Sequence, residues 1–283
     1  MTPPSAFDDW IGRSEAVEDF IAPAPAQAAA ATLDDADARF EDGTAVPPLW
    51  HWFYFLPKAP ASRIGPDGHP QRGGFLPPIA LPRRMFAGAR LRFAAPLLVG
   101  RPATREGVIR AVSQKSGRSG TLAFVTVGYT IRQDGRVCIE EEQDIVYREP
   151  GAPVPPPGIL ADLPPPPTGA WARVVQPDPV LLFRFSALTF NAHRIHYDRP
   201  YAMREEGYPG LVVHGPLTAV LLLDLVHRHA AGRSVAAFTF RGEAPLFDLA
   251  PFRLSGLVQG DTVELHAHGP DGRTAMSATA QLG

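Results

Sequence analysis

Short runs of alternating or continuous apolar residues fill two parts of the chain, residues 88–147 and 235–282. Such runs, bounded by turn residues, are typical of β-strands with one buried face. The first part contains ARLRFAAPLLVG, GVIRAVSQKSG, GTLAFVTVGYTIRQDG and RVCIEEEQDIVY, and the second VAAFTFRGEAPLF, FRLSGLV, DTVELHAHG and RTAMSATAQL. Asp-Gly pairs at 134–135 and 271–272 separate neighbouring runs, and Asp-Gly is typical of hairpin turns. We therefore predict two antiparallel meanders.

A helix is predicted before each meander. Residues 25–40, PAQAAAATLDDADARF, are rich in strong helix formers, and residues 215–230, GPLTAVLLLDLVHRHA, are apolar on nearly every side, as in a helix enclosed by its own sheet. Between them, residues 186–201 read as a loop. RFAAPLLVG at 92–100 also resembles RGEAPLFDL at 241–249, which indicates a duplication. The pattern predicts an α+β double hotdog, in which two antiparallel sheets each wrap around a long central helix.

Proline-rich stretches divide the chain at residues 57–82 and 150–167. We interpret the second stretch as a linker between halves. The expected division is a degenerate N-terminal hotdog at 1–150, a linker at 151–168 and a catalytic C-terminal hotdog at 169–283. The first half is expected to be the degenerate one because its helix is built mainly of alanine.

Composition narrows the class of protein. An apolar share of 45% with 20% charged residues indicates a folded globular chain, and a net charge of -2 with scattered basic residues argues against nucleic acid as a partner. Cys138, the single cysteine, excludes an intramolecular disulfide and suits a reducing cytosol. Neither a signal peptide nor an apolar stretch of about 18 residues is present, so we expect a cytoplasmic protein without membrane contact.

Polar residues that can carry chemistry are concentrated in RFSALTFNAHRIHYDRPYA, residues 184–202. The segment resembles the signature of R-specific enoyl-CoA hydratases and MaoC-like dehydratases, in which a carboxylate lies five residues before a catalytic histidine and an aspartate two residues after it. Asn191, His196 and Asp198 occupy these positions. Further along, GLVVHGPLTA resembles the family motif whose backbone N–H binds the thioester oxygen, which assigns that role to Gly215.

A closer resemblance covers about residues 45–283. PLWHWFYFLP, DGHPQRGGFLPPIALPRRMFAG and SALTFNAHRIHYD are similar to the subgroup of mesaconyl-C4-CoA hydratases, itaconyl-CoA hydratases and mitochondrial-type 3-hydroxyacyl-thioester dehydratases. The resemblance implies hydration of a short branched dicarboxylyl-CoA to citramalyl-CoA. It implies an acyl-CoA substrate and no cofactor, and we also expect a homodimer. Dehydration of fatty-acid-type 3-hydroxyacyl thioesters is the alternative within the subgroup.

The expected roles come from the chemistry of water addition, which needs a base, an acid and donors facing the thioester oxygen. His196 is expected to be the base, with its ring oriented by Asp198, while Asn191 holds the attacking water. An amide does not exchange protons near neutral pH, so Asn191 leaves the second proton-handling group open. His193, or His196 acting as a shuttle, is expected to protonate C2.

Arginines are expected to bind the charged parts of the substrate, because a guanidinium matches a carboxylate or phosphate. Arg194, two residues before His196, is predicted to bind the distal carboxylate. Arg83 and Arg84 fit either that role or the phosphates of coenzyme A. His214 is expected to cap the second helix or to line the pocket.

Other interpretations compete with these. His193, His196 and Asp198 could mimic a metal-binding triad, although the hydratase motif explains their spacing better, so we expect no metal. His51 and His69, each isolated in sequence, are interpreted as solvated or structural, and the aromatic run 50–55 as core. A hotdog thioesterase and a binding module without catalysis remain alternative functions.

Overall fold

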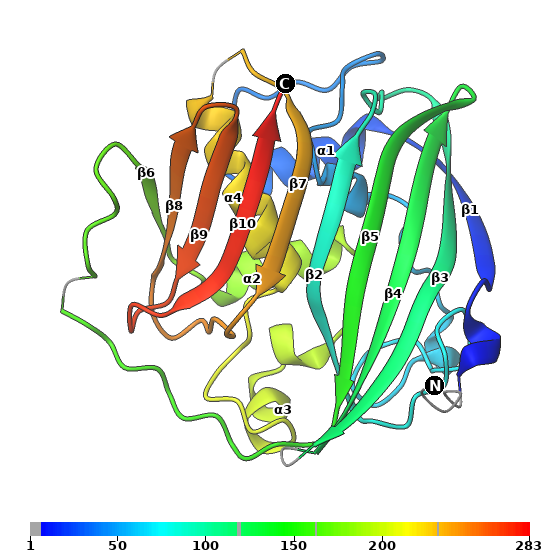
Figure 1. Cartoon of the computed structure of the whole chain (residues 1–283), viewed down its shortest axis with the longest axis vertical. Helices are drawn as coiled ribbons and strands as arrows, with labels where there is room; N and C mark the ends of the chain where they lie inside the picture. Colours follow the sequence, from blue (N-terminus) through cyan, green and yellow to red (C-terminus); the bar gives the residue numbers. More distant parts are fainter. Residues whose placement is uncertain (1–6, 118–119, 162, 231) are drawn as a thin grey trace.

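Ten strands, paired antiparallel throughout, form one continuous sheet in the computed structural model, which describes residues 7–117, 120–161, 163–230 and 232–283 (Figure 1). Their order across the sheet is β1-β3-β4-β5-β2-β7-β10-β9-β8-β6. The strands are β1 (Ser14–Phe20), β2 (Arg83–Phe93), β3 (Pro102–Gly117), β4 (Gly120–Gln133), β5 (Arg136–Arg148), β6 (Trp171–Val175), β7 (Val235–Gly242), β8 (Phe252–Gln259), β9 (Thr262–His268) and β10 (Thr274–Leu282).

The two predicted meanders are confirmed, but their sheets are joined edge to edge instead of being separate. The junction is the antiparallel pair β2 and β7, in which Gly88 lies opposite Arg241. A Cβ at Gly88 would lie 2.4 Å from the carbonyl oxygen of Phe240, so only glycine permits this approach of the two backbones. At the predicted hairpin between β4 and β5, Asp134 and Gly135 have φ of 51° and 75°, as a tight primed turn requires.

Four α-helices pack against the sheet or line its margin: α1 (Pro23–Thr32), α2 (Pro179–Leu188), α3 (Arg199–Arg204) and α4 (Gly215–His229). The prediction for α4 is confirmed. All residues from Leu217 to Val226 are buried, because the sheet of the second half covers the helix as Figure 1 shows. None of the helices in the described ranges is long and apolar enough to cross a membrane.

The first predicted helix is wrong in extent. α1 ends at Thr32, whereas the prediction extends to residue 40. The acidic run after Leu33 breaks it: Asp34 has a left-handed φ of 59°, and Asp35 accepts a hydrogen bond from the backbone N–H of Ala38. Aspartate side chains compete for backbone donors in this way and favour turns over helices.

Apart from the short 3₁₀ helices, the sequence pattern does not predict four elements, namely β1, β6, α2 and α3. The two strands lie at opposite edges of the sheet. Helix α2 begins before the predicted loop 186–201 and ends within it. Its start does have a local signal, because the side chain of Asp178 accepts from the N–H of Leu181 and Pro179 occupies the first turn.

The duplication is visible in the backbone hydrogen bonds. In each half, two consecutive residues after the strand at the junction donate to one carbonyl oxygen: Ala94 and Ala95 to Cys138, and Glu243 and Ala244 to Ala275. An isolated bridge is present in each half, between Ala45 and Leu98 and between Val212 and Phe247. The two Ala-Pro-Leu segments noted in the sequence therefore occupy equivalent positions.

Candidate active site

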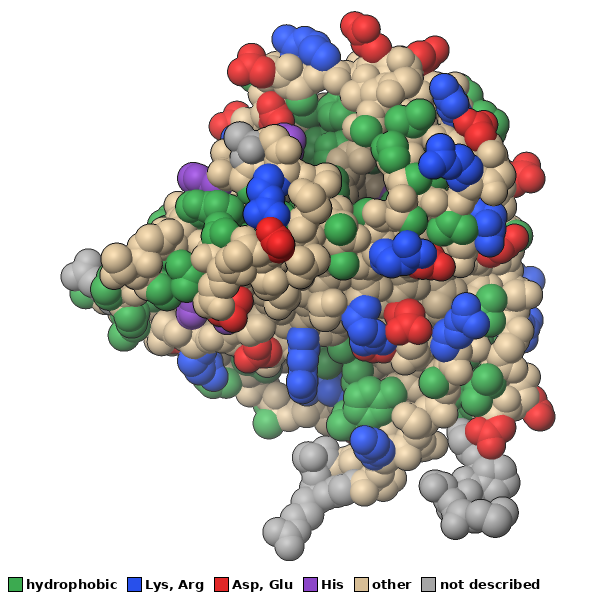
Figure 2. Space-filling model, turned by 45° about the horizontal axis from the view of Figure 1, so that its top comes forward, with side chains coloured by type: hydrophobic (Ala, Val, Ile, Leu, Met, Phe, Trp, Pro, Cys, Tyr) green, Lys and Arg blue, Asp and Glu red, His purple; other side chains and the backbone are tan. Residues whose placement is uncertain are grey.

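A cavity of about 1310 Å³ lies between the two halves and receives residues from both. From the first half come His69 and Arg84, and from the second come Asn191, His196 and Gly215. Its wall is mostly apolar, and Figure 2 likewise shows a hollow in the molecule with hydrophobic side chains in its wall. Basic and acidic side chains are interspersed on the face shown there.

His196 is positioned by a short 3₁₀ helix, η4 (Arg194–His196), and its side chain is buried. Its Nδ1 lies 2.7 Å from the carbonyl oxygen of Val212. A carbonyl only accepts hydrogen bonds, so Nδ1 carries the hydrogen and Nε2 keeps its lone pair. Burial lowers the pKa of His196 to about 4, against the opposing effect of the Val212 carbonyl. The ring is therefore neutral at pH 7 and can accept a proton at Nε2.

Four histidine rings form a continuous cluster in the cavity. The His196 ring is stacked on His214, with centroids 3.6 Å apart, and His193 lies 5.4 Å from His196. His69 extends the cluster, 4.0 Å from His193. Burial lowers the pKa of His193 to about 2 and that of His214 well below its usual value. The hydroxyl of Ser186 lies 2.8 Å from Nε2 of His214 and fixes that ring.

Asn191 also lines the cavity. Its Oδ1 accepts a hydrogen bond of 3.0 Å from the backbone N–H of His193, and its own backbone N–H donates to the carbonyl of Ser186. Because Oδ1 is occupied by a donor, the Nδ2 group is the part of the amide left to donate to a ligand.

Asp198 lies outside this arrangement. Its Oδ1 accepts from the N–H of Tyr201 at the start of α3, and its Oδ2 lies 2.8 Å from Nη2 of Arg194. The prediction that Asp198 orients the His196 ring is therefore wrong. The Val212 carbonyl makes that contact, because Asp198 serves as the N-cap of α3.

Arg194 points away from the cavity. Its Nε and Nη2 donate to Asp198, its Nη1 donates to the carbonyl of Pro66, and the guanidinium lies 4.0 Å from the ring centroid of Tyr201. Arg194 is not among the residues that line the cavity and already pairs with Asp198, so the structure does not place it to bind a distal carboxylate, contrary to the prediction.

The other two arginines, Arg83 and Arg84, differ in whether they reach the cavity. Arg83 is buried beside the cavity, where it donates to the carbonyl of Glu206 and pairs with the carboxylate of the same residue at 3.2 Å. It does not line the cavity, contrary to expectation. Arg84, the next residue, does line it. Adjacent residues of a strand point to opposite faces, which explains why only one of the pair reaches the cavity.

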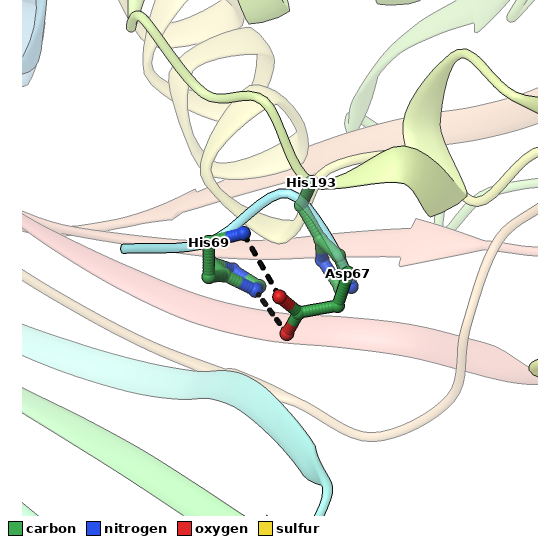
Figure 3. Close-up of side chains that lie close together, drawn as sticks. All are labelled: Asp67, His69 and His193. Carbon is green, nitrogen blue, oxygen red and sulfur yellow. Dashed lines mark hydrogen bonds and ion pairs between the residues drawn. The ribbon is translucent and has the colours of Figure 1, made fainter. Parts of the chain in front are cut away.

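Asp67 and His69, which sequence reasoning does not assign to the site, lie against it. His69 Nδ1 and Asp67 Oδ2 are 3.0 Å apart, and the backbone N–H of His69 donates to Asp67 Oδ1, also at 3.0 Å (Figure 3). The sequence alone favours a solvated or structural His69. The one signal that distinguishes this histidine is its pairing with an aspartate two residues earlier, inside a proline-rich stretch.

Asp67, His69 and His193 have side-chain nitrogen and oxygen atoms within 4.8 Å of one another, but both oxygens of Asp67 already pair with His69, so we assign no metal to these three residues. The triad considered from sequence, which used Asp198, does not form because Arg194 holds that carboxylate. In the new trio, Asp67 already accepts hydrogen bonds from His69, as Figure 3 shows.

Comparison with known proteins identifies the family of this chain. The family model for hydroxyacyl-thioester dehydratase type 2 matches residues 49–248. A mesaconyl-C(4)-CoA hydratase of Chloroflexus aurantiacus is 66% identical over 274 residues, covering 97% of each chain. The mitochondrial hydroxyacyl-thioester dehydratase type 2 of Schizosaccharomyces pombe is 27% identical, covering 84% of this chain and 88% of that protein.

The fold has solved relatives as well. A conserved hypothetical protein of Mycobacterium tuberculosis, described as a double hotdog, matches with a TM-score of 0.60 at 14% identity and covers 98% of each chain. The predicted α+β double hotdog is thus confirmed.

Proposed function

Because the chain belongs to the hydroxyacyl-thioester dehydratase type 2 family, we propose that it is a hydro-lyase that adds water to mesaconyl-C4-CoA and yields citramalyl-CoA. The observation that carries the proposal is the His196 ring, neutral and fixed at Nδ1, in the same cavity as the N-terminus of α4. The name of the relative that is 66% identical supports the choice of substrate.

Water addition would proceed in two steps. Nε2 of His196 takes a proton from water while the water oxygen bonds to C3, and the C2–C3 π electrons move toward the thioester, giving an enolate. The enolate then re-forms the carbonyl and takes a proton at C2. Asn191, through Nδ2, holds the attacking water. The fixed tautomer of His196 supports its role as base, since one nitrogen is already committed to Val212.

The backbone N–H of Gly215 is the proposed donor to the enolate oxygen. Gly215 is the first residue of α4, where an N–H has no acceptor within the helix and the helix dipole favours negative charge. Pro216 is next and has no N–H of its own. A Cβ at Gly215 would meet only the carbonyl oxygen of Phe86 within 4 Å, at 3.8 Å, so the space beside this backbone is open to a thioester.

Arg84 is the proposed partner of the substrate carboxylate. In mesaconyl-C4-CoA that carboxylate is attached to C3, close to the reacting atoms. Arg84 lines the cavity, and its charge acts on both His69 and His193, so it lies near the cluster where C3 would be. This assignment replaces the expected role of Arg194.

The test is an assay of the purified protein with mesaconyl-C4-CoA, itaconyl-CoA and crotonyl-CoA. We expect the enoyl-thioester absorbance to fall fastest with mesaconyl-C4-CoA and the product to gain the mass of one water. A preference for itaconyl-CoA would change the substrate but keep the product. No hydration of any of the three, or release of free thiol, would overturn the proposal, with thiol release indicating a thioesterase.

Dehydration in the opposite direction is the second candidate, favoured by the match to the hydroxyacyl-thioester dehydratase of S. pombe. The same site would remove water from a 3-hydroxyacyl thioester. Comparing kcat/KM for 3-hydroxybutyryl-CoA with that for citramalyl-CoA separates the two, because only the second substrate has a carboxylate for Arg84.

A further inference from the structure

Two protons move during hydration, and the residues assigned so far account for one. His196 takes the proton of water, but the amide of Asn191 cannot give one to C2. We propose that His69, positioned by Asp67, is the catalytic residue that exchanges the proton at C2. This inference rests on the proposed function and assigns a catalytic group to the first half of the chain.

In the described structure, one ring nitrogen of His69 pairs with Asp67, and the ring itself lines the cavity. Its Nδ1 lies 3.0 Å from a carboxylate oxygen of Asp67, so Nδ1 carries the hydrogen and Nε2 is left to transfer a proton. The ring lines the cavity, and its centroid lies 4.0 Å from that of His193, with the two ring planes tilted by 41°. With 16% of its side chain exposed, His69 is largely shielded from bulk water but still accessible to a ligand.

The loop that carries His69 is fixed directly onto the segment that carries His196. The backbone N–H of Arg194 donates to the carbonyl of Asp67 at 2.9 Å. Gly68 approaches the same segment so closely that a Cβ there would lie 1.7 Å from the carbonyl oxygen of Ala192. The outward-facing guanidinium of Arg194 adds a third contact through Pro66. Such fixing holds two proton-transfer groups at a constant separation, as a two-proton reaction needs.

His69 suits this role better than His193 because it has a carboxylate partner. Burial alone would raise the pKa of Asp67, but hydrogen bonds from His69 outweigh burial and hold that pKa well below its usual value. Asp67 thus stays ionised and stabilises a protonated His69. The charged and titratable groups facing His69 are Asp67, Arg84, Arg72 and His193.

Burial and the two arginines lower the pKa of His69, and Asp67 opposes them. His193 has no such hydrogen-bonded carboxylate: its side chain is buried among histidines, and burial takes its pKa to about 2. His193 is therefore the neutral ring between the two proton-transfer groups.

The protons balance over one turnover. The protonated form of His69 is the minority form at neutral pH because its pKa is lowered, and Asp67 stabilises it. This form gives its proton to C2 of the enolate, while neutral His196 has taken one from water. The products are the hydrated thioester, neutral His69 and protonated His196. Return of one proton from His196 to His69, through solvent in the open cavity, restores the starting state, so the net reaction consumes one water and releases no proton.

The decisive experiment separates the C2 proton from water addition. The saturated analogue of mesaconyl-C4-CoA cannot be hydrated, but its C2 hydrogens exchange with deuterium if the enzyme forms the enolate. We expect His69→Gln to lose at least about a hundredfold in both exchange and hydration, the usual contribution of an acid-base group. His196→Gln should lose hydration by a similar factor and keep most of the exchange. His227→Gln is the matched control, since His227 is exposed and about 18 Å along α4 from Gly215.

A second variant distinguishes catalysis from a structural role. Asp67→Asn keeps the shape of the hydrogen bond but no longer stabilises protonated His69. We expect kcat to fall more than KM changes, and the alkaline limb of the kcat pH profile to move to lower pH. A purely structural Asp67 would leave that limb in place. Thermal unfolding of each variant shows whether the fold is retained.

Three results overturn the assignment. The first is exchange by His69→Gln at the wild-type rate, and the second is equal loss of exchange in His196→Gln, which would make His196 the shuttle. The third is loss of exchange in His193→Gln with retention in His69→Gln. If the wild type hydrates no enoyl thioester, the proposed function fails. This outcome comes from the hydration assay, whereas the role of His69 is tested by the exchange assay.

Discussion

The two halves share a strand pattern but differ in the helix that comes after their equivalent bridges. After Val212 the second half forms α4, fifteen residues long and buried for most of its length. After Ala45 the first half forms only a 3₁₀ helix, η2 (Trp50–Phe53), and its own α-helix, α1, lies earlier in the chain. The first half thus has the strands of the repeat without a long helix at the position of α4. The half that has this helix provides the helix N-terminus at the cavity.

The half without that helix contributes a long loop to the cavity wall. Residues 57–82, where the chain has left η2, run along the cavity and include Gly68, His69 and Arg72 in its wall. Trp52, from η2 itself, also lines it, and packs edge-on against Phe86 and Phe240 across the junction of the sheets. Where the second half has a long helix, the first half thus has part of the cavity wall and the loop that carries Asp67 and His69.

The cores of the two halves also differ, because the first contains a buried carboxylate at a position where the second has alanine. Glu141 is three residues beyond Cys138, and the equivalent residue of the second half is Ala278, three beyond Ala275. Glu141 is buried and is hydrogen-bonded by His51, Trp52 and Gln143, at 3.0, 3.0 and 2.8 Å. A polar cluster thus fills part of the first half where the second half is apolar.

The largest expected effect comes from the half that holds His196, the proposed base. His196→Ala should lower kcat by about two to four orders of magnitude, the usual contribution of general acid-base catalysis. Its secondary-structure content should be unchanged, because His196 lies in a short 3₁₀ turn at the cavity. Steady-state kinetics on mesaconyl-C4-CoA measure this. A variant that keeps more than about a tenth of the activity would remove His196 from the mechanism.

Removing the buried carboxylate of the first half, Glu141, should lower the stability of the fold. Glu141→Ala removes the acceptor of three buried donors, so we expect the free energy of unfolding to fall by about 3 to 5 kcal/mol. Glu140→Ala is the control, because its side chain is 47% exposed and pairs with Arg92 at the surface, where about 0 to 1 kcal/mol is usual. Chemical denaturation gives both values. Equal losses in the two variants would mean that the buried cluster has no special role in this half.

Local pattern is enough to predict α4 and the hairpin turns. The all-round apolar character of residues 215–230 and the Asp-Gly turns depend on neighbours in sequence, and both elements form where expected. The edge strands β1 and β6 escape prediction because each pairs with one strand only, and that partner is distant in sequence. The end of α1 escapes it because helix formers continue past the acidic run that stops the helix.

Contacts between residues distant in sequence also decide which site residues could be predicted. Asn191, His196 and Gly215, which line the cavity, can be selected from sequence because they lie in short motifs that resemble those of known hydratases. His69 cannot, because its contact with His193 depends on how the 57–82 stretch docks on the other half, and no local pattern encodes that docking. The role predicted for Arg194 fails for a related reason: sequence spacing does not tell which way a side chain points from a 3₁₀ turn.

An effect of intermediate size is expected on substrate specificity when Arg84, which lines the cavity, is compared with Arg194, which lies outside it. We expect Arg84→Gln to lower kcat/KM for mesaconyl-C4-CoA by about 10-fold to 100-fold, the range for losing a hydrogen bond to a charged group, and to change crotonyl-CoA little. Arg194→Gln should affect both substrates equally, because its guanidinium holds Asp198 and Pro66 outside the cavity. Selective loss in Arg194→Gln instead of Arg84→Gln would reverse this assignment.

Substitutions of Asn191 should have the smallest effect on kcat. They test how the second half works without a carboxylate at this position. Asn191→Ala removes one neutral hydrogen bond to the attacking water, so kcat should fall only about 2-fold to 10-fold. Asn191→Asp should be at least partly active, since a carboxylate oxygen can still accept from the N–H of His193. Its negative charge should raise the pKa of His196 from about 4, and the acid limb of the kcat/KM profile should then move to higher pH. If Asn191→Asp were as inactive as His196→Ala, the amide itself would be the essential donor, and the proton at C2 would depend wholly on the pair from the first half.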